Sequence, residues 1–288
     1  AIFDNPQHPY TQKLLAAIPS GQKTAETVTP DPLIRIENLR TWFTPTGGAG
    51  PVKAVEDVSL EIHRGEVLGL VGESGSGKST LGRSILRLVP ITDGQITFEG
   101  TELSSLEGRS LKQFRHRMQM IFQDPYASLN PRMTVYDTLA EPLLLHGLVR
   151  KADLDQAIRE LMDNVGLARA FVRKYPHEFS GGQRQRIAIG RALATRPEFI
   201  VADEPVSALD VTIQAQILDL LADLTKEYGL TMLFISHDLA VIRQIADRIA
   251  VMYHGKLVEE GSTAQVFETP QQDYTRSLLA AIPGANAA

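Results

Sequence analysis

Nine consecutive residues in the first third of the chain have the types and spacing of a phosphate-binding loop. In order they are Gly72, Glu73, Ser74, Gly75, Ser76, Gly77, Lys78, Ser79 and Thr80. In this pattern glycines let backbone N–H groups turn toward phosphate oxygens, while the lysine reaches the outer phosphates and the following hydroxyl ligates magnesium. The loop follows the apolar run Val67 to Val71 and precedes a helical pattern, as the motif requires. The sequence therefore predicts a phosphate site rather than only a glycine-rich turn.

Two adjacent carboxylates, Asp203 and Glu204, come directly after the strand-like apolar run Phe199 to Ala202. Phosphoryl transfer uses one carboxylate in the magnesium shell and another to orient and polarise the attacking water. We expect Asp203 and Glu204 to take these two roles in that order. Because an acidic pair after a strand more often caps a helix, this interpretation depends on the phosphate loop upstream.

A third motif opens a predicted helix that runs to about Ala194. It consists of Ser180, Gly181, Gly182 and Gln183. The free N–H groups of such a helix start, together with the serine hydroxyl, can bind an anion. The alternative is an ordinary capped helix. The spacing favours a phosphate role, because the motif lies about twenty residues before Asp203 and downstream of the phosphate loop.

These three motifs, in this order, resemble the nucleotide-binding domain of ABC transporters. The resemblance implies ATP and Mg²⁺ as cofactors and implies that the Ser-Gly-Gly-Gln signature binds the γ-phosphate held by an opposing domain. It also implies roles for three further residues. Gln123 would sense magnesium and the attacking water, Asp210 would lie in the loop that crosses to the opposite site, and His237 would contact the γ-phosphate.

The same resemblance predicts an aromatic side chain that stacks on the adenine. Phe43 best fits the register of the family, and Trp42 is the alternative. Stacking needs only a π face, so either residue type suits the role. The resemblance extends over about residues 33 to 284.

Two segments are similar to the oligopeptide, dipeptide and glutathione importers within this family. They are residues 123–131, Gln-Asp-Pro-Tyr-Ala-Ser-Leu-Asn-Pro, and residues 175–179, Tyr-Pro-His-Glu-Phe. The resemblance implies an ATP hydrolase, peripheral to the cytoplasmic face of the inner membrane, that powers peptide import. Its implied partners are a second nucleotide-binding domain, two transmembrane permease subunits that contact residues 124–146, and indirectly an extracytoplasmic solute-binding protein.

Three other functions compete with this interpretation. An exporter motor stays open, since the motifs do not encode direction. A soluble ABC ATPase acting on nucleic acid or ribosomes would usually carry coiled-coil insertions or basic arms, and the chain shows neither. An ATP-binding scaffold without turnover would be favoured by the loss of Glu204 or His237, and both are present.

The elements that must position these residues alternate between strand and helix. Strand-like segments are expected at Leu33–Leu39, Val58–Ile62, Val67–Val71, Gln95–Phe98, Phe199–Ala202 and Met232–Ile235. Helical patterns cover residues 134–170, 182–194 and 213–226. Alternation of this kind predicts a mainly parallel α/β sheet. With the resemblance, it predicts a P-loop NTPase fold with a RecA-like core, a small antiparallel β-subdomain at residues 33–65 and a helical subdomain at about residues 125–180.

The composition limits the remaining possibilities. The 288 residues are 43% hydrophobic, carry a formal net charge of −5, and include no cysteine. Disulfides, zinc–thiolate sites and cysteine-ligated clusters are thereby excluded. No apolar run approaches the roughly 20 residues that span a bilayer. Without a basic stripe there is no nucleic-acid footprint, so we expect no nucleic-acid partner.

The two ends of the chain share a sequence repeat. Residues 2–19 align without a gap to residues 266–283, at an offset of 264, with eleven identities in eighteen positions. The repeat predicts that residues 1–19 are the tail of a preceding nucleotide-binding domain in a fused tandem motor. Residues 20–32 would then be a linker, residues 33–262 this nucleotide-binding domain, and residues 263–288 an extension of the peptide-importer type.

Overall fold

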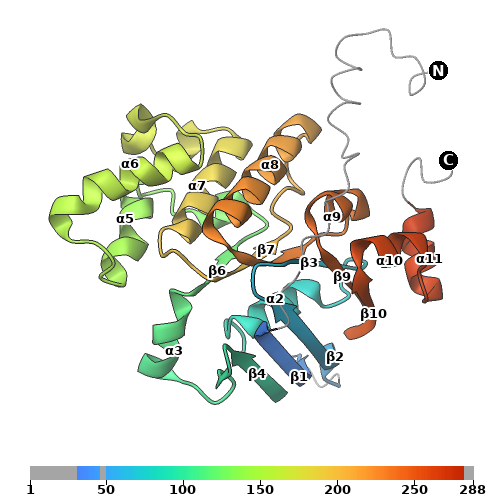
Figure 1. Ribbon diagram of the computed structural model, residues 1–288. Helices are drawn as coiled ribbons and strands as arrows, with labels where there is room; N and C mark the ends of the chain where they lie inside the picture. The colour runs from blue at the N-terminus through green and yellow to red at the C-terminus, as the bar shows by residue number, and fades with distance from the viewer. Residues whose placement is uncertain (1–30, 46–49, 282–288) are drawn as a thin grey trace, which may run out of the picture.

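A six-stranded sheet lies at the centre of the computed structural model, which describes residues 31–45 and 50–281 (Figure 1). Its order is β10 (Lys256–Ser262), β9 (Arg248–Tyr253), β3 (Val67–Val71), β8 (Thr231–Ile235), β7 (Phe199–Asp203) and β6 (Met118–Ile121). All neighbours are parallel except β10, which pairs antiparallel with β9. Strands β3, β7 and β8 are buried along their whole length, which is why they read as unbroken apolar runs. The predicted mainly parallel sheet is confirmed.

A second, antiparallel sheet covers one side of the core. Its order is β2 (Val52–His63), β1 (Pro32–Phe43), β4 (Asp93–Phe98) and β5 (Thr101–Glu102). The small antiparallel sheet expected at residues 33–65 is therefore present. Its first two strands are each 12 residues long, beyond the limits that alternation predicted. Register shifts between β1 and β2 interrupt the alternation of buried and exposed residues, which hid the true strand ends.

The two faces of the central sheet belong to two separate hydrophobic cores. Leu68, Val201 and Leu233 face the antiparallel sheet and α2 (Lys78–Ile85). Ile200 and Phe234 face α8 (Val211–Tyr228), α9 (Leu239–Ile245) and the helical lobe. Alternate residues of one strand thus serve opposite cores, so the sheet holds both halves of the molecule in a fixed relation.

A helical lobe stands at the β6 side of the sheet in Figure 1. It contains α4 (Pro125–Ser128), α5 (Val135–Leu145), α6 (Leu154–Asn164) and α7 (Gly181–Leu193), with short 3₁₀ turns η1 (Lys151–Asp153), η2 (Arg169–Arg173) and η3 (Pro176–Glu178). The region 134–170, expected to be largely helical, is interrupted after α5 and α6. Gly147 and Gly166 adopt positive φ angles of 64° and 65° just past those helices, as helix-ending glycines do.

The remaining helices lie at the two edges of the central sheet (Figure 1). Helix α3 (Gly108–Arg115) follows β5, and α10 (Thr263–Glu268) and α11 (Asp273–Ala280) follow β10 and lie beside it (Figure 1). The expected tail at residues 1–19 and most of the expected linker at residues 20–32 lie outside the described residues. Within the described ranges, none of the helices combines the length and apolarity that crossing a membrane requires.

Candidate active site

The predicted phosphate loop connects β3 to α2, and its shape depends on close backbone contacts. Gly72 and Gly77 have φ angles of 147° and 103°. A Cβ atom at Gly72 would lie 2.1 Å from the carbonyl oxygen of Met252, and one at Gly77 would lie 2.0 Å from that of Ala54. Only glycine fits at these two positions, so the end of β9 and the start of β2 define the floor of the loop.

Lys78 lies inside this loop, with only 5% of the residue exposed. Its Nζ atom donates hydrogen bonds to the carbonyl oxygens of Gly72, at 2.7 Å, and Glu73, at 2.8 Å. Burial lowers the pKa of Lys78, while the carboxylates of Glu204 and Asp203 oppose that effect. The loop therefore holds the Lys78 ammonium at its centre, on two backbone carbonyl oxygens.

Ser79, in the first turn of α2, contacts Asp203, the last residue of β7. The Ser79 hydroxyl donates to Oδ1 of Asp203 at 2.7 Å. Asp203 is 1% exposed, and its other oxygen, Oδ2, accepts no hydrogen bond from the described residues; the Arg83 guanidinium lies 3.6 Å away. Burial raises the pKa of Asp203, against the hydrogen bond from Ser79. A hydroxyl beside a buried, incompletely paired carboxylate is a donor set that fits Mg²⁺.

Three predicted catalytic residues meet at one carboxylate oxygen. Gln123 Nε2 donates to Oε2 of Glu204 at 3.0 Å, and His237 Nδ1 lies 3.2 Å from the same atom. Glu204 has a left-handed backbone, with φ 46°, and its N–H donates to the carbonyl oxygen of Ile235 at 3.0 Å. This uncommon turn carries the carboxylate from the buried end of β7 out toward the phosphate loop.

One cavity of about 410 Å³ gathers these groups. It is lined by residues from the phosphate loop, β2, and the ends of β6, β7 and β8, namely Ala54, Ser74, Gly75, Gly77, Lys78, Ser79, Thr80, Gln123, Glu204 and His237. A lysine, a hydroxyl and a general base around a glycine-rich loop are the parts that phosphoryl transfer to water needs. The sequence predicted all of these lining residues except Ala54.

The signature residues and Asp210 lie away from this cavity and are not among its lining residues. Ser180 caps α7: its hydroxyl accepts from the N–H of Gln183 at 3.4 Å, and the Gln183 side chain accepts from the N–H of Ser180 at 3.1 Å. Asp210 caps α8 by accepting from the N–H of Ile213 at 3.1 Å. Ser180, Gln183 and Asp210 thus make local capping contacts, and neither the signature nor Asp210 lines the cavity of its own chain.

The two aromatic candidates for adenine stacking differ in their surroundings. The indole N–H of Trp42 donates to the Glu56 carboxylate at 2.7 Å, which ties this ring to the antiparallel sheet. Phe43 ends β1 and is 41% exposed. Neither residue lines the 410 Å³ cavity. The accessible ring of Phe43 is the better suited of the two to receive a base.

Sequence reasoning missed a side chain from the far end of the chain that contacts the phosphate loop. Tyr274, on α11, accepts a hydrogen bond from the N–H of Glu73 at 3.0 Å across 201 residues of sequence. The available signal was the repeat, whose two copies share the pair Tyr-Thr at residues 10–11 and 274–275.

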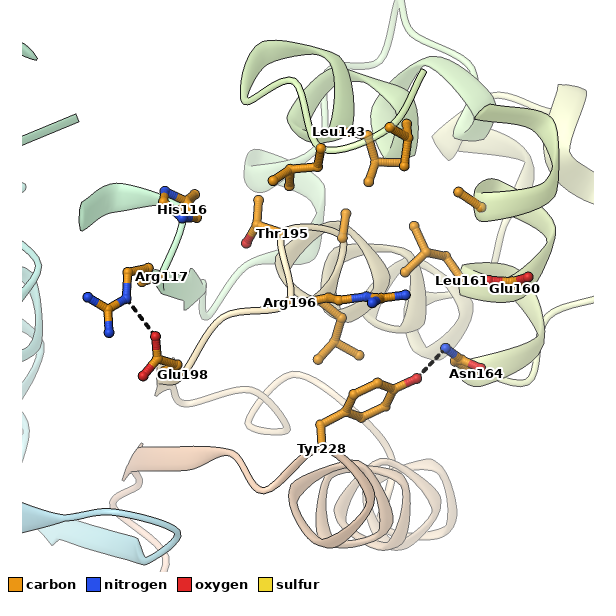
Figure 2. A pocket seen from close by; sticks show the side chains of 15 residues that line it. His116, Arg117, Leu143, Glu160, Leu161, Asn164, Thr195, Arg196, Glu198 and Tyr228 are labelled. Carbon is orange, nitrogen blue, oxygen red and sulfur yellow. Dashed lines mark hydrogen bonds and ion pairs between the residues drawn. The ribbon is translucent and has the colours of Figure 1, made fainter. Parts of the chain in front are cut away.

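A larger cavity, of about 520 Å³, lies elsewhere, between the helical lobe and the starts of β6 and β7 (Figure 2). Its polar groups largely pair with one another: Arg117 Nε donates to Glu198 at 2.6 Å, and Asn164 donates to the Tyr228 hydroxyl at 2.6 Å. It contains none of the predicted site residues. This cavity is larger than the 410 Å³ cavity, but the groups that phosphoryl transfer uses line the smaller one.

Two family models match the chain. One, described as ABC transporter, matches residues 55–207, and the other, described as oligopeptide/dipeptide transporter, C-terminal region, matches residues 1–39 and 258–288. The oligopeptide transport ATP-binding protein OppF of Bacillus subtilis is 56% identical over 254 residues, covering 87% of this chain and 82% of that protein. The glutathione import ATP-binding protein GsiA of Pectobacterium atrosepticum is 47% identical over 316 residues, covering 99% of this chain and 51% of that protein. The chain thus spans about half the length of the glutathione import relatives.

Solved structures show the same fold. A dimeric ATP-binding cassette in a post-hydrolysis state, bound to ADP and Pi, matches with a TM-score of 0.73 and 30% identity, over 80% of this chain and 98% of that one. The cbiO1 protein of Clostridium perfringens, part of a transporter complex, matches with a TM-score of 0.71 over 88% of this chain and 96% of that one. At 24% identity, the second likeness supports the fold alone.

Proposed function

Because this chain belongs to the ABC transporter family, as the order of its motifs predicts, we propose that it binds and hydrolyses ATP to power the import of peptides or peptide-like solutes. One observation carries the chemical part of the proposal. Lys78, the Ser79–Asp203 pair and the Gln123–Glu204–His237 cluster converge on a single cavity at the carboxyl ends of parallel strands. In open α/β sheets, ligands bind at this edge.

The proposed roles follow from the contacts. Lys78 keeps its contact with the Gly72 carbonyl and turns its other N–H donors to phosphate oxygens, and the N–H groups of the loop cradle the phosphates. Ser79 and Asp203 would hold Mg²⁺, which supplies charge neutralisation between the phosphates. Glu204 accepts a proton from the attacking water, while Gln123 and His237 orient that water and the outer phosphate. Phe43 stacks on the adenine.

Two domains are needed for a complete site in this proposal. Ser180 to Gln183 and Asp210 lie outside the cavity of their own chain, so we assign them to the nucleotide of a facing domain. A second nucleotide-binding domain is therefore the first partner. The repeat of residues 2–19 at residues 266–283 supports a facing domain joined upstream through residues 20–32. The native reading frame tests this: an upstream phosphate loop and signature in frame support it, and an initiation codon directly before Ala1 argues against it.

Membrane partners complete the proposal. A groove of about 400 Å³ at the start of the helical lobe is lined by Phe122, Gln123, Asp124 and Ala127, with Arg83 and Arg191 beside them. We assign residues 124–146 to contact with two permease subunits, at the cytoplasmic face of the inner membrane. A solute-binding protein would act on those permeases from the other side. Import of peptides is favoured over export because the OppF and GsiA relatives are import or oligopeptide transport ATP-binding proteins.

Two substitutions separate binding from hydrolysis. Lys78→Ala should weaken ATP binding and abolish turnover, because it removes the cation from the loop. Glu204→Gln should keep ATP binding and lower turnover about a hundredfold or more, since an amide accepts no proton. Nucleotide binding and phosphate release measured on the full chain check both, with the exposed Glu227→Gln as a control that should match wild type. Wild-type turnover in Glu204→Gln would refute its role as base.

A further inference from the structure

The C-terminal helix α11 touches the phosphate loop directly, through the hydroxyl of Tyr274. This hydroxyl accepts the N–H of Glu73 at 3.0 Å. The peptide that carries this N–H also carries the carbonyl of Gly72, whose oxygen accepts from Lys78 Nζ at 2.7 Å. In a planar trans peptide the N–H and C=O point in opposite directions. Holding the N–H on the outside of the loop therefore holds the carbonyl on the inside, facing the ammonium.

The ring of Tyr274 is itself held in place by its neighbours. It packs on Tyr253 with ring centroids 4.1 Å apart and planes tilted by 38°. Tyr253 is the last residue of β9, directly after Met252, whose carbonyl oxygen borders Gly72. The tyrosine pair thus rests on the same strand end that forms the floor of the loop, so packing on Tyr253 aims the Tyr274 hydroxyl.

The start of α11 is fixed separately, by Glu259 on β10. One oxygen of its carboxylate accepts the N–H of Gln271 at 2.7 Å, and the other accepts the N–H of Gln272 at 3.0 Å. Hydrogen bonds of backbone N–H groups to a carboxylate are charge-assisted and stronger than neutral ones. The helix therefore cannot slide along β10 without breaking two of them, and Tyr274 stays in register with the loop.

We propose that the C-terminal extension is a working part of the nucleotide site, in which Tyr274 is a positioning residue that orients the Gly72–Glu73 peptide and, through it, the Lys78 ammonium for ATP. The inference rests on the proposed function, because it takes ATP to be the ligand of Lys78. Binding is tighter when the groups that meet a ligand are already oriented in the free protein. The hydroxyl supplies that orientation from outside the loop.

The central test is Tyr274→Phe in the full chain, which removes the hydroxyl and keeps the ring. Loss of one hydrogen bond should raise the dissociation constant and the KM for ATP about two- to tenfold and leave kcat unchanged. The melting temperature should not change, because the ring still packs on Tyr253. The matched control is Tyr228→Phe, which removes a hydroxyl bonded to Asn164 in the cavity of Figure 2 and should leave ATP affinity at the wild-type value.

A double-mutant cycle tests whether Glu259 affects ATP binding by fixing α11, and with it Tyr274. Glu259→Ala releases the start of α11 and should weaken ATP binding to a similar degree. In the double variant with Tyr274→Phe, Glu259→Ala should weaken ATP binding little further, because both substitutions act on the hydrogen bond between Tyr274 and Glu73. Three outcomes would each overturn the inference. The ATP affinity of Tyr274→Phe could be unchanged, or the two substitutions could be fully additive in their effect on ATP affinity. The loss of ATP affinity could also follow only from a lower melting temperature. A wild-type chain that binds no ATP would instead refute the proposed function.

Discussion

At the scale of single residues, Asp203 is a buried carboxyl group whose Oδ2 accepts no hydrogen bond from the described residues. Burial raises its pKa, so ionisation is less favourable in the folded chain than in the unfolded chain. Its ionisation therefore costs stability. The cost is absent below the ordinary carboxyl pKa of about 4, grows as pH rises to the higher folded pKa, and is complete above it.

We therefore predict that Asp203→Asn stabilises the protein in the absence of nucleotide and magnesium. The asparagine oxygen can still accept the Ser79 hydroxyl, while the buried charge is gone. Its melting temperature should exceed that of wild type at pH 7–8, and the difference should shrink as pH falls toward about 4. A gain of about 1 kcal/mol would appear as about 2–4 °C.

Thermal unfolding across a pH series, without nucleotide and magnesium, measures this difference. The exposed Asp223→Asn on α8 should follow wild type at every pH. A stabilisation of Asp203→Asn that stays constant with pH, or a destabilisation at neutral pH, would show that the buried charge is not the cause.

At the scale of elements, the signature helix α7 packs tightly on α8 through a glycine. A Cβ atom at Gly182 would lie 2.3 Å from Cγ2 of Ile213, whereas one at Gly181 would make an ordinary contact, 3.5 Å from Leu209. The two adjacent signature glycines therefore differ in whether the packing has room for a larger side chain. Gly182 allows the two helices to approach, and Gly181 is free of that constraint.

This difference gives a matched pair of substitutions. Gly182→Ala should destabilise the chain by about 1–3 kcal/mol through overpacking, partly offset by the better helix propensity of alanine. Gly181→Ala should leave the melting temperature unchanged or slightly higher. Thermal unfolding without nucleotide compares the two. Equal melting temperatures would mean that Ile213 rotates away and that α7 is not held at this point.

Strands that are buried along their whole length were predictable from the sequence. The buried strands β3, β7 and β8 read as apolar runs between turn residues, and the phosphate loop and acidic pair were recognisable at their ends. Strands β6 and β9 were missed, although most of their residues are buried. Each is a short apolar run next to a helical pattern, where a strand and a buried helix segment look alike.

Contacts between distant segments were not predictable in the same way. The convergence of Gln123 and His237 on Glu204 follows from the order of the parallel strands, which periodicity does not give. The family resemblance predicted roles for these residues but not that order. The left-handed backbone of Glu204 has no signal in its residue type, because glutamate rarely adopts it. The bond of Tyr274 to Glu73 depends on how α11 docks on β10, which no local pattern encodes.

At the scale of the whole molecule, the separation of the signature from the phosphate cavity predicts how activity depends on concentration. If two domains act as a pair, each nucleotide site needs the phosphate loop of one domain and the signature of the other, so one copy alone completes no site. The specific ATPase activity of this isolated chain should rise with protein concentration, or when a partner domain is added. Physical linkage of two domains should remove this dependence, because it raises their effective concentration.

A dilution series of steady-state phosphate release tests the point. Tyr228→Phe, altered in the remote cavity, should show the same dependence as wild type. Specific activity that stays flat from the highest to the lowest concentration would mean that a single chain completes its own site.

The shared oxygen of Glu204 has a consequence for the resting protein. With Gln123 and His237 both turned to Oε2, the base is engaged before any substrate water arrives. It becomes available only when those two side chains turn toward a bound nucleotide. A copy without nucleotide should therefore keep Glu204 paired. The same three side chains would in this way hold back proton transfer until a nucleotide has bound.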